Sequence, residues 1–136
     1  MKKLLLFSAI FLVSVTSCKK DTPLSEAIIG KWDVVSMTQV TYQNNVKKES
    51  TTEYPDANYM AIEFAASGSG IYYENNDVYA VFSWTLSGAT ITVNGFTPPE
   101  WDITIDKDYL TWTYSEVSTD DSTVTYEYSF TAKKSN

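Results

Sequence analysis

The chain has 136 residues, of which 43% are hydrophobic and 20% are charged, and this is the size and composition of a single globular domain. It carries 10 basic and 17 acidic residues, so its formal net charge of −7 repels the phosphates of nucleic acid. The absence of His and the single Cys exclude imidazole-based catalysis, His-based metal sites, internal disulfides and Cys-cluster metal sites. We therefore expect no catalytic residue, no metal, no cofactor and no nucleic-acid partner, and we predict that the protein is not an enzyme.

The first 17 residues have the pattern of a secretory signal peptide. Lys2 and Lys3 form a basic start, and a largely apolar run of 12 residues follows from Leu4 to Val15. At ~1.5 Å per residue this run is too short to cross a hydrocarbon core of ~30 Å as a helix, but it suits a signal-peptide core. We predict that residues 1–17 are removed from the mature protein.

The signal segment ends in Val15-Thr16-Ser17-Cys18, which contains the only Cys of the chain. This sequence resembles a bacterial lipobox. The resemblance implies that cleavage occurs before Cys18 and that its thiol receives a lipid, with fatty acids such as palmitate as the membrane anchor. An ordinary secretory signal with an incidental Cys near the cleavage site is the alternative.

Lipidation at Cys18 would make the protein a Gram-negative lipoprotein of the cell envelope. We expect a lipid anchor in the outer membrane, on either its periplasmic or its surface-exposed face. Residues 18–25 are then a short polar tether, and residues 26–136 form the folded domain.

Apolar and polar residues alternate with a period of two through most of this domain, as in the segment from Trp101 to Ile105. One apolar face per strand favours antiparallel strands around one core. The alternation predicts eight strands, near residues 31–42, 59–65, 70–74, 78–86, 89–95, 101–106, 109–116 and 123–132. The fold class that we predict is all-β, an eight-stranded antiparallel up-and-down barrel, with a β-sandwich as the alternative.

The connections between these strands differ in length. We interpret the longer ones, at residues 43–58, 96–100 and 117–122, as loops that surround one end of the barrel. Tight turns such as Ser87-Gly88 close the other end.

The first predicted strand opens with Gly30-Lys31-Trp32, directly after a short stretch that suits a helical turn. This opening resembles that of the lipocalins, in which Gly-x-Trp enters the first strand at the closed end of the barrel. The resemblance implies that Trp32 plugs the base of the barrel and that a cation from the last strand packs over it. Because the chain has no Arg, Lys134 is the candidate for this cation.

A second motif supports the resemblance, since Lys107-Asp108-Tyr109 stands where lipocalins carry Thr-Asp-Tyr. The resemblance covers residues 27–134. The chain lacks the C-terminal helix and the disulfide of the animal lipocalins, and it is more similar to small bacterial lipocalin-like lipoproteins.

Inward-facing residues near the predicted long loops are the candidates for a shallow ligand pocket. They combine small side chains with aromatic ones that carry polar groups: Tyr73, Ala80, Val93, Trp101, Tyr114 and Tyr126. The alternative is that the tyrosines meet across the barrel and leave no room. At the other end, the bulky inward residues fill the interior: Trp32, Phe64, Trp84, Ile105, Leu110 and Phe130.

Two functions remain open on this reasoning. The protein either binds a small apolar or amphipathic ligand at the membrane, or it is a cell-surface interaction protein with a glycan or protein partner. A cavity of about a few hundred Å³ near the loops would favour the first function.

We expect the acidic group Asp102, Asp106 and Asp108 to be a solvated face rather than a glycosidase pair.

Overall fold

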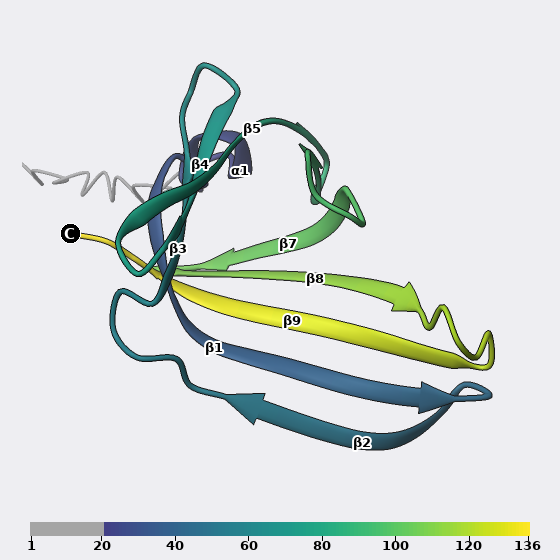
Figure 1. Cartoon of the computed structure of the whole chain (residues 1–136). Coiled ribbons are helices and arrows are strands. Elements are labelled where there is room, and N and C mark those ends of the chain that lie inside the picture. The colour runs from purple at the N-terminus through teal and green to yellow at the C-terminus, as the bar shows by residue number, and fades with distance from the viewer. Residues whose placement is uncertain (1–20) are drawn as a thin grey trace, which may run out of the picture.

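The computed structural model describes residues 21–136, and Cys18 and the predicted signal peptide lie outside the described residues. The chain forms a closed eight-stranded antiparallel up-and-down barrel with one extra strand (Figure 1), so the predicted fold class is confirmed. A short helix, α1 (Leu24–Ala27), precedes the strands. The strands are β1 (Gly30–Gln43), β2 (Val46–Glu53), β3 (Met60–Phe64), β4 (Ser69–Glu74), β5 (Asp77–Ser87), β6 (Thr90–Asn94), β7 (Glu100–Asp106), β8 (Tyr109–Val117) and β9 (Val124–Lys134).

Helix α1 lies partly within the segment that we predicted as a tether. Leu24 packs against the hydrophobic core, so the folded part of the chain reaches back to this residue. Among residues 21–136, no helix has the length and apolar character needed to cross a membrane.

Strand β1 changes its neighbour halfway along its length. Residues 30–33 pair with β3, whereas residues 37–43 pair with β2. On its other side β1 pairs with β9 from Trp32 to Gln43, which closes the barrel. The far parts of β1, β8 and β9 therefore continue, together with β2, as a four-stranded sheet beyond the barrel (Figure 1). We call this sheet the extension; it comprises residues 37–43, 46–53, 112–117 and 124–130.

Strand β2 corrects the sequence analysis, in which we predicted residues 43–58 to be a loop. A tight turn at Asn44 and Asn45, with φ angles of 50° and 63°, reverses the chain into β2. Asn adopts such left-handed conformations more readily than most residues. Every residue of β2 is exposed, so no apolar alternation marks the strand, and its pairing with β1 defines it instead.

The closed end of the barrel is built around Trp32. This side chain is fully buried, and its Nε1 donates a hydrogen bond to the Ile28 carbonyl at 2.7 Å. Lys134 lies over the indole and also donates to the Ala27 carbonyl at 3.2 Å. Gly30 has a φ of +126°, and a Cβ there would lie 3.2 Å from Cε of Lys134. The packing predicted for these residues is therefore present.

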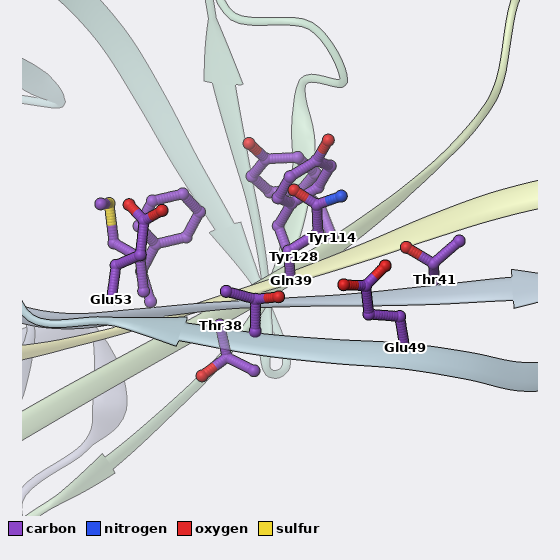
Figure 2. A pocket seen from close by; sticks show the side chains of 10 residues that line it. Thr38, Gln39, Thr41, Glu49, Glu53, Tyr114 and Tyr128 are labelled. Atoms are coloured by element: carbon purple, nitrogen blue, oxygen red, sulfur yellow. The ribbon is translucent and has the colours of Figure 1, made fainter.

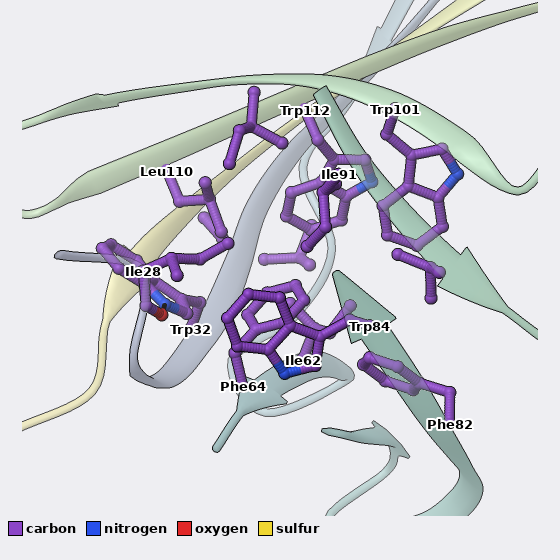
Figure 3. Packing of buried hydrophobic residues seen from close by; sticks show 14 residues of the cluster. Ile28, Trp32, Ile62, Phe64, Phe82, Trp84, Ile91, Trp101, Leu110 and Trp112 are labelled. Carbon is purple, nitrogen blue, oxygen red and sulfur yellow. Dashed lines mark hydrogen bonds between the residues drawn. The ribbon is translucent and has the colours of Figure 1, made fainter. Parts of the chain in front are cut away.

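Aromatic rings pack across the barrel towards the other end (Figure 3). Phe96, from the connection between β6 and β7, has its ring centroid 5.5 Å from that of Phe82 and 5.3 Å from that of Trp101. Trp101 Nε1 donates to the Pro98 carbonyl at 2.9 Å and so holds this connection against the core. The rings at this end therefore meet around Phe96, whereas the expectation concerned the tyrosines of the predicted pocket.

Candidate functional site

A groove of about 490 Å³ lies on the extension rather than inside the barrel (Figure 2). It runs along the face that continues the barrel interior, because Met37 pairs with Phe130, and Phe130 pairs with the buried Trp112. Its lining residues come from β1, β2, β8 and β9: Met37, Thr38, Gln39, Thr41, Glu49, Thr51, Glu53, Tyr114, Tyr128 and Phe130.

Three rows of cross-strand partners form the inner face of the extension. Direct partners on antiparallel strands share a face and bring their side chains into contact. Taken from β2 through β1 and β9 to β8, the rows are Glu53–Met37–Phe130–Trp112, Thr51–Gln39–Tyr128–Tyr114 and Glu49–Thr41–Tyr126–Glu116. Each row thus begins with a polar residue on β2 and reaches an aromatic ring on β9.

A register shift in β1 places these residues inside. The pairing with β9 shifts between Val34 and Ser36, so Val34 and Met37 both lie on the inner face, and Val35 is exposed. Without this irregularity, strict alternation after Val34 would have put Thr38 rather than Met37 and Gln39 on the inner face.

The side of the groove formed by β8 and β9 is a stack of aromatic rings. Phe130 stacks on Trp112 with centroids 5.1 Å apart and an interplanar angle of 5°. Tyr128 packs against Tyr114 at 5.2 Å, and the ring of Tyr114 in turn lies 6.1 Å from that of Trp101. The barrel core therefore supports the aromatic side of the groove and limits the rotation of its rings.

The opposite side is acidic. Glu49 and Glu53 of β2 line the groove, and none of its lining residues is basic. Burial, with a smaller effect of the nearby Glu116, raises the pKa of Tyr128 from 10.0 to about 12, so this phenol stays neutral even in moderately alkaline solution. The groove thus combines neutral aromatic rings with carboxylates, hydroxyls and an amide.

The structure separates the six residues predicted to line a pocket. Val93 and Trp101 are buried in the core, and Ala80 is half-buried opposite Tyr72 on the inner face. Tyr114 lines the groove, and Tyr126 lies in the next row of the same face.

The inward orientation predicted for Tyr73 is wrong. Its hydroxyl donates to the Glu63 carboxylate at 2.7 Å, and Lys31 Nζ lies 4.3 Å from its ring centroid on the outer face. The inward positions of β4 are Gly70, which pairs with Phe64, and Tyr72, which packs against the core. Gly70 has no side chain that reports burial, and Ile71 is apolar, so the sequence of β4 does not distinguish the two alternations.

Sequence reasoning missed most of the groove. All but one of its residues on β1 and β2 are polar, and none of these polar residues was predicted as a site residue: Thr38, Gln39, Thr41, Glu49, Thr51 and Glu53. Two signals were available, the Asn44-Asn45 turn after a long strand and the β-branched Thr51-Thr52 beyond it. Tyr128 belongs to the inward series of β9 but was not chosen as a site residue.

The acidic residues Asp102, Asp106 and Asp108 are exposed, as expected for a solvated face. Thr90 Oγ1 donates to Asp102 at 2.9 Å across the strands β6 and β7. Within residues 21–136, no group of three or more potential metal-ligating side chains is found.

No protein-family model matches the chain, and a search of curated proteins found no significant match.

Proposed function

We propose that this protein is a lipid-anchored binding protein of the cell envelope that holds a small amphipathic molecule in the groove of its extension, and that it acts by binding rather than by catalysis. The observation that carries this proposal is the composition of the groove. Met37, Phe130 and Tyr128 supply apolar surface on one side, and Glu49 and Glu53 supply hydrogen-bond acceptors on the other. A molecule with an apolar body and a polar group matches both sides.

The groove replaces the barrel interior as the proposed ligand site. Phe96, Trp101 and other rings pack across the interior, whereas the groove is open to solvent along β2. Of the predicted pocket residues, Tyr114 and Tyr126 remain candidates for ligand contact. Trp101 supports Tyr114 from the core side.

The membrane anchor is proposed from the sequence, because Cys18 lies outside the described residues. The lipobox-like Val15-Thr16-Ser17-Cys18 supports lipidation, and outer-membrane attachment follows from it as a proposal. The few residues between Cys18 and Leu24 would keep the barrel close to the bilayer, since ~3.3–3.6 Å per residue is the reach of an extended chain.

The test uses three amphiphiles with the same alkyl chain: decyltrimethylammonium, decyl glucoside and decyl sulfate, all below their micellar concentrations. Thr51→Trp should abolish saturable binding, because an indole would fill the groove from an exposed position on β2. Ser50→Trp is the matched control, since Ser50 pairs with Val40 on the opposite face. Binding is measured by calorimetry. If no amphiphile binds, or if Thr51→Trp binds like Ser50→Trp, the proposal is wrong.

A second candidate function is that of a surface interaction protein, with a protein or glycan partner. Strand β5 favours it, because Val78, Tyr79 and Val81 are 60%, 68% and 70% exposed. Exposed apolar side chains close together in the chain favour an interaction surface. Val81→Asp would then reduce crosslinking to a neighbouring protein in intact cells and leave amphiphile binding unchanged.

A further inference from the structure

The charges on the inner face of the extension all have the same sign. The three rows contain Glu49, Glu53 and Glu116 and no Lys. Two lysines precede Glu49 on β2: Lys47 pairs with Tyr42, which follows Thr41 and lies on the other face, and Lys48 falls at the register shift and has no partner on β1. A positively charged group in the groove would therefore meet carboxylates from β2 without a competing cation from the rows.

The carboxylates and the aromatic rings face each other across β1. Glu53 and Phe130 are both direct partners of Met37, and Thr51 and Tyr128 are both partners of Gln39. Two strand spacings of ~4.8 Å separate β2 from β9, so about 10 Å lies between the two backbones. A substituted ammonium group placed over β1 would lie within reach of side chains from both strands.

Both sides of the groove attract cations by different physical means. Carboxylates do so by charge, and aromatic rings do so through the negative potential over their faces. The Tyr128 side chain lines the groove beside Tyr126, with the two ring centroids 6.4 Å apart. Its ring packs against Tyr114 on one side, and Gln39 is its cross-strand neighbour on the other.

We propose that the molecule held in the groove carries an organic cation, a substituted ammonium group lodged between Glu49 and Glu53 and the ring of Tyr128, with its apolar part against Met37 and Phe130. This inference rests on the proposed function and adds the charge of the ligand. An anionic amphiphile is repelled by the same two carboxylates. A neutral glycoside satisfies the acceptors with hydroxyl groups but gains nothing from their charge.

The headgroup series tests the sign of the charge. Decyltrimethylammonium should bind to the full-length protein about tenfold more tightly than decyl sulfate, with decyl glucoside between them, since exposed charge pairs contribute ~0.2–1 kcal/mol each. The preference for ammonium should weaken as salt is added, because the groove is open to solvent. Equal binding of the three headgroups would overturn the inference and leave the proposed function intact. Absence of all binding would overturn both.

Two double variants test which carboxylates act. Glu49→Gln with Glu53→Gln should reduce the ammonium affinity about threefold, which is the half of the tenfold preference that comes from attraction, and leave the glucoside affinity unchanged. Glu100→Gln with Glu127→Gln removes the same charge elsewhere; Glu127 pairs with Val40 on the opposite face and Glu100 begins β7. If both double variants lose the ammonium preference equally, the effect is one of net charge and the assigned site is wrong.

The Tyr128→Leu variant distinguishes the contribution of the aromatic ring to ligand affinity from that of the carboxylates. It keeps an apolar side chain on β9 and should lower ammonium affinity more than glucoside affinity, because the charged headgroup gains more from the negative potential over the ring face. Circular dichroism checks that the variant keeps its strand content. Equal losses for both headgroups would show that Tyr128 contributes apolar contact alone and would overturn its assigned role.

Discussion

Lys134 and Trp32 are direct cross-strand partners, and the Lys134 Nζ lies 5.1 Å from the centroid of the Trp32 ring. The two residues are 102 positions apart in the chain and belong to the first and last strands of the barrel, β1 and β9. Their contact therefore joins the ends of the meander at the point where the barrel closes. Helix α1 covers the same point, since Trp32 and Lys134 both donate hydrogen bonds to carbonyls next to it.

The Trp32→Ala variant should lose ~3–5 kcal/mol of unfolding free energy, because a large buried ring leaves a cavity when it is truncated. This is a large fraction of the ~5–15 kcal/mol typical of a small domain. Denaturant unfolding measures the loss. An unchanged midpoint would mean that the ring is not buried in solution.

The Lys134→Met variant tests the cation over the ring. We expect a loss of about 1 kcal/mol, from the cation–π contact and the hydrogen bond to Ala27. Lys133→Met is the matched control, because Lys133 is the exposed neighbour on the same strand. Equal effects of the two substitutions would contradict a specific role for Lys134.

The Gly70→Ala variant should be destabilised by ~1–3 kcal/mol, as is usual when a packed core is overfilled. A Cβ at this position would overlap the ring of Phe82. Adding Phe82→Leu should recover part of the loss by making room, so the two effects will not add. Strict additivity in thermal unfolding would show that the clash with Phe82 is not the cause.

Stability should fall above about pH 10 because of Tyr72. Burial, with a smaller effect of Glu74, raises the pKa of this phenol from 10.0 to about 12. Between these values the unfolded chain releases the proton and the folded chain retains it, so a rise in pH favours unfolding. Tyr72→Phe should make the loss less steep, whereas Tyr54→Phe, at a residue that is 77% exposed, should not. Parallel pH profiles for the wild type and Tyr72→Phe would contradict this origin.

Cys18→Ala should abolish labelling of the protein by a fatty-acid precursor and release it from the membrane fraction. Several acyl chains at ~0.8 kcal/mol per buried CH₂ give the anchor its strength, and no other lipidation site is proposed. Ser17→Ala keeps a small residue at the predicted cleavage site and serves as the control. A membrane-bound mature protein with an unmodified Cys18 would rule out the lipid anchor.

Eight of the nine strands could be predicted because apolar and polar residues alternate along them, and the apolar residues are the ones that the barrel buries. Trp101 and Ile103, or Leu110 and Trp112, lie on the inner face at every second position and are nearly inaccessible to solvent. The resemblance to lipocalins at Gly30 and Trp32 also indicated which end of the barrel is closed. The packing at that end involves few residues, so a short motif was enough to predict it.

The rest of the site depends on features that leave no periodic signal. Strand β2 has no buried side chain, and the register shift beside Val35 changes which residues of β1 face inward. Gly70 hid the orientation of Tyr73 in the same way. The groove is therefore a product of strand pairing beyond the core, which residue type alone does not encode.

The proposed ligand site is the groove and not the interior of the barrel. The most direct measurement is a titration of the isotope-labelled protein with decyltrimethylammonium, followed through the backbone amide shifts. We predict saturable changes centred on Gln39, Thr51 and Tyr128, with little change at Ala80 and Val93. Changes centred on Ala80 and Val93 would place the ligand inside the barrel, and the absence of saturable changes would contradict binding altogether.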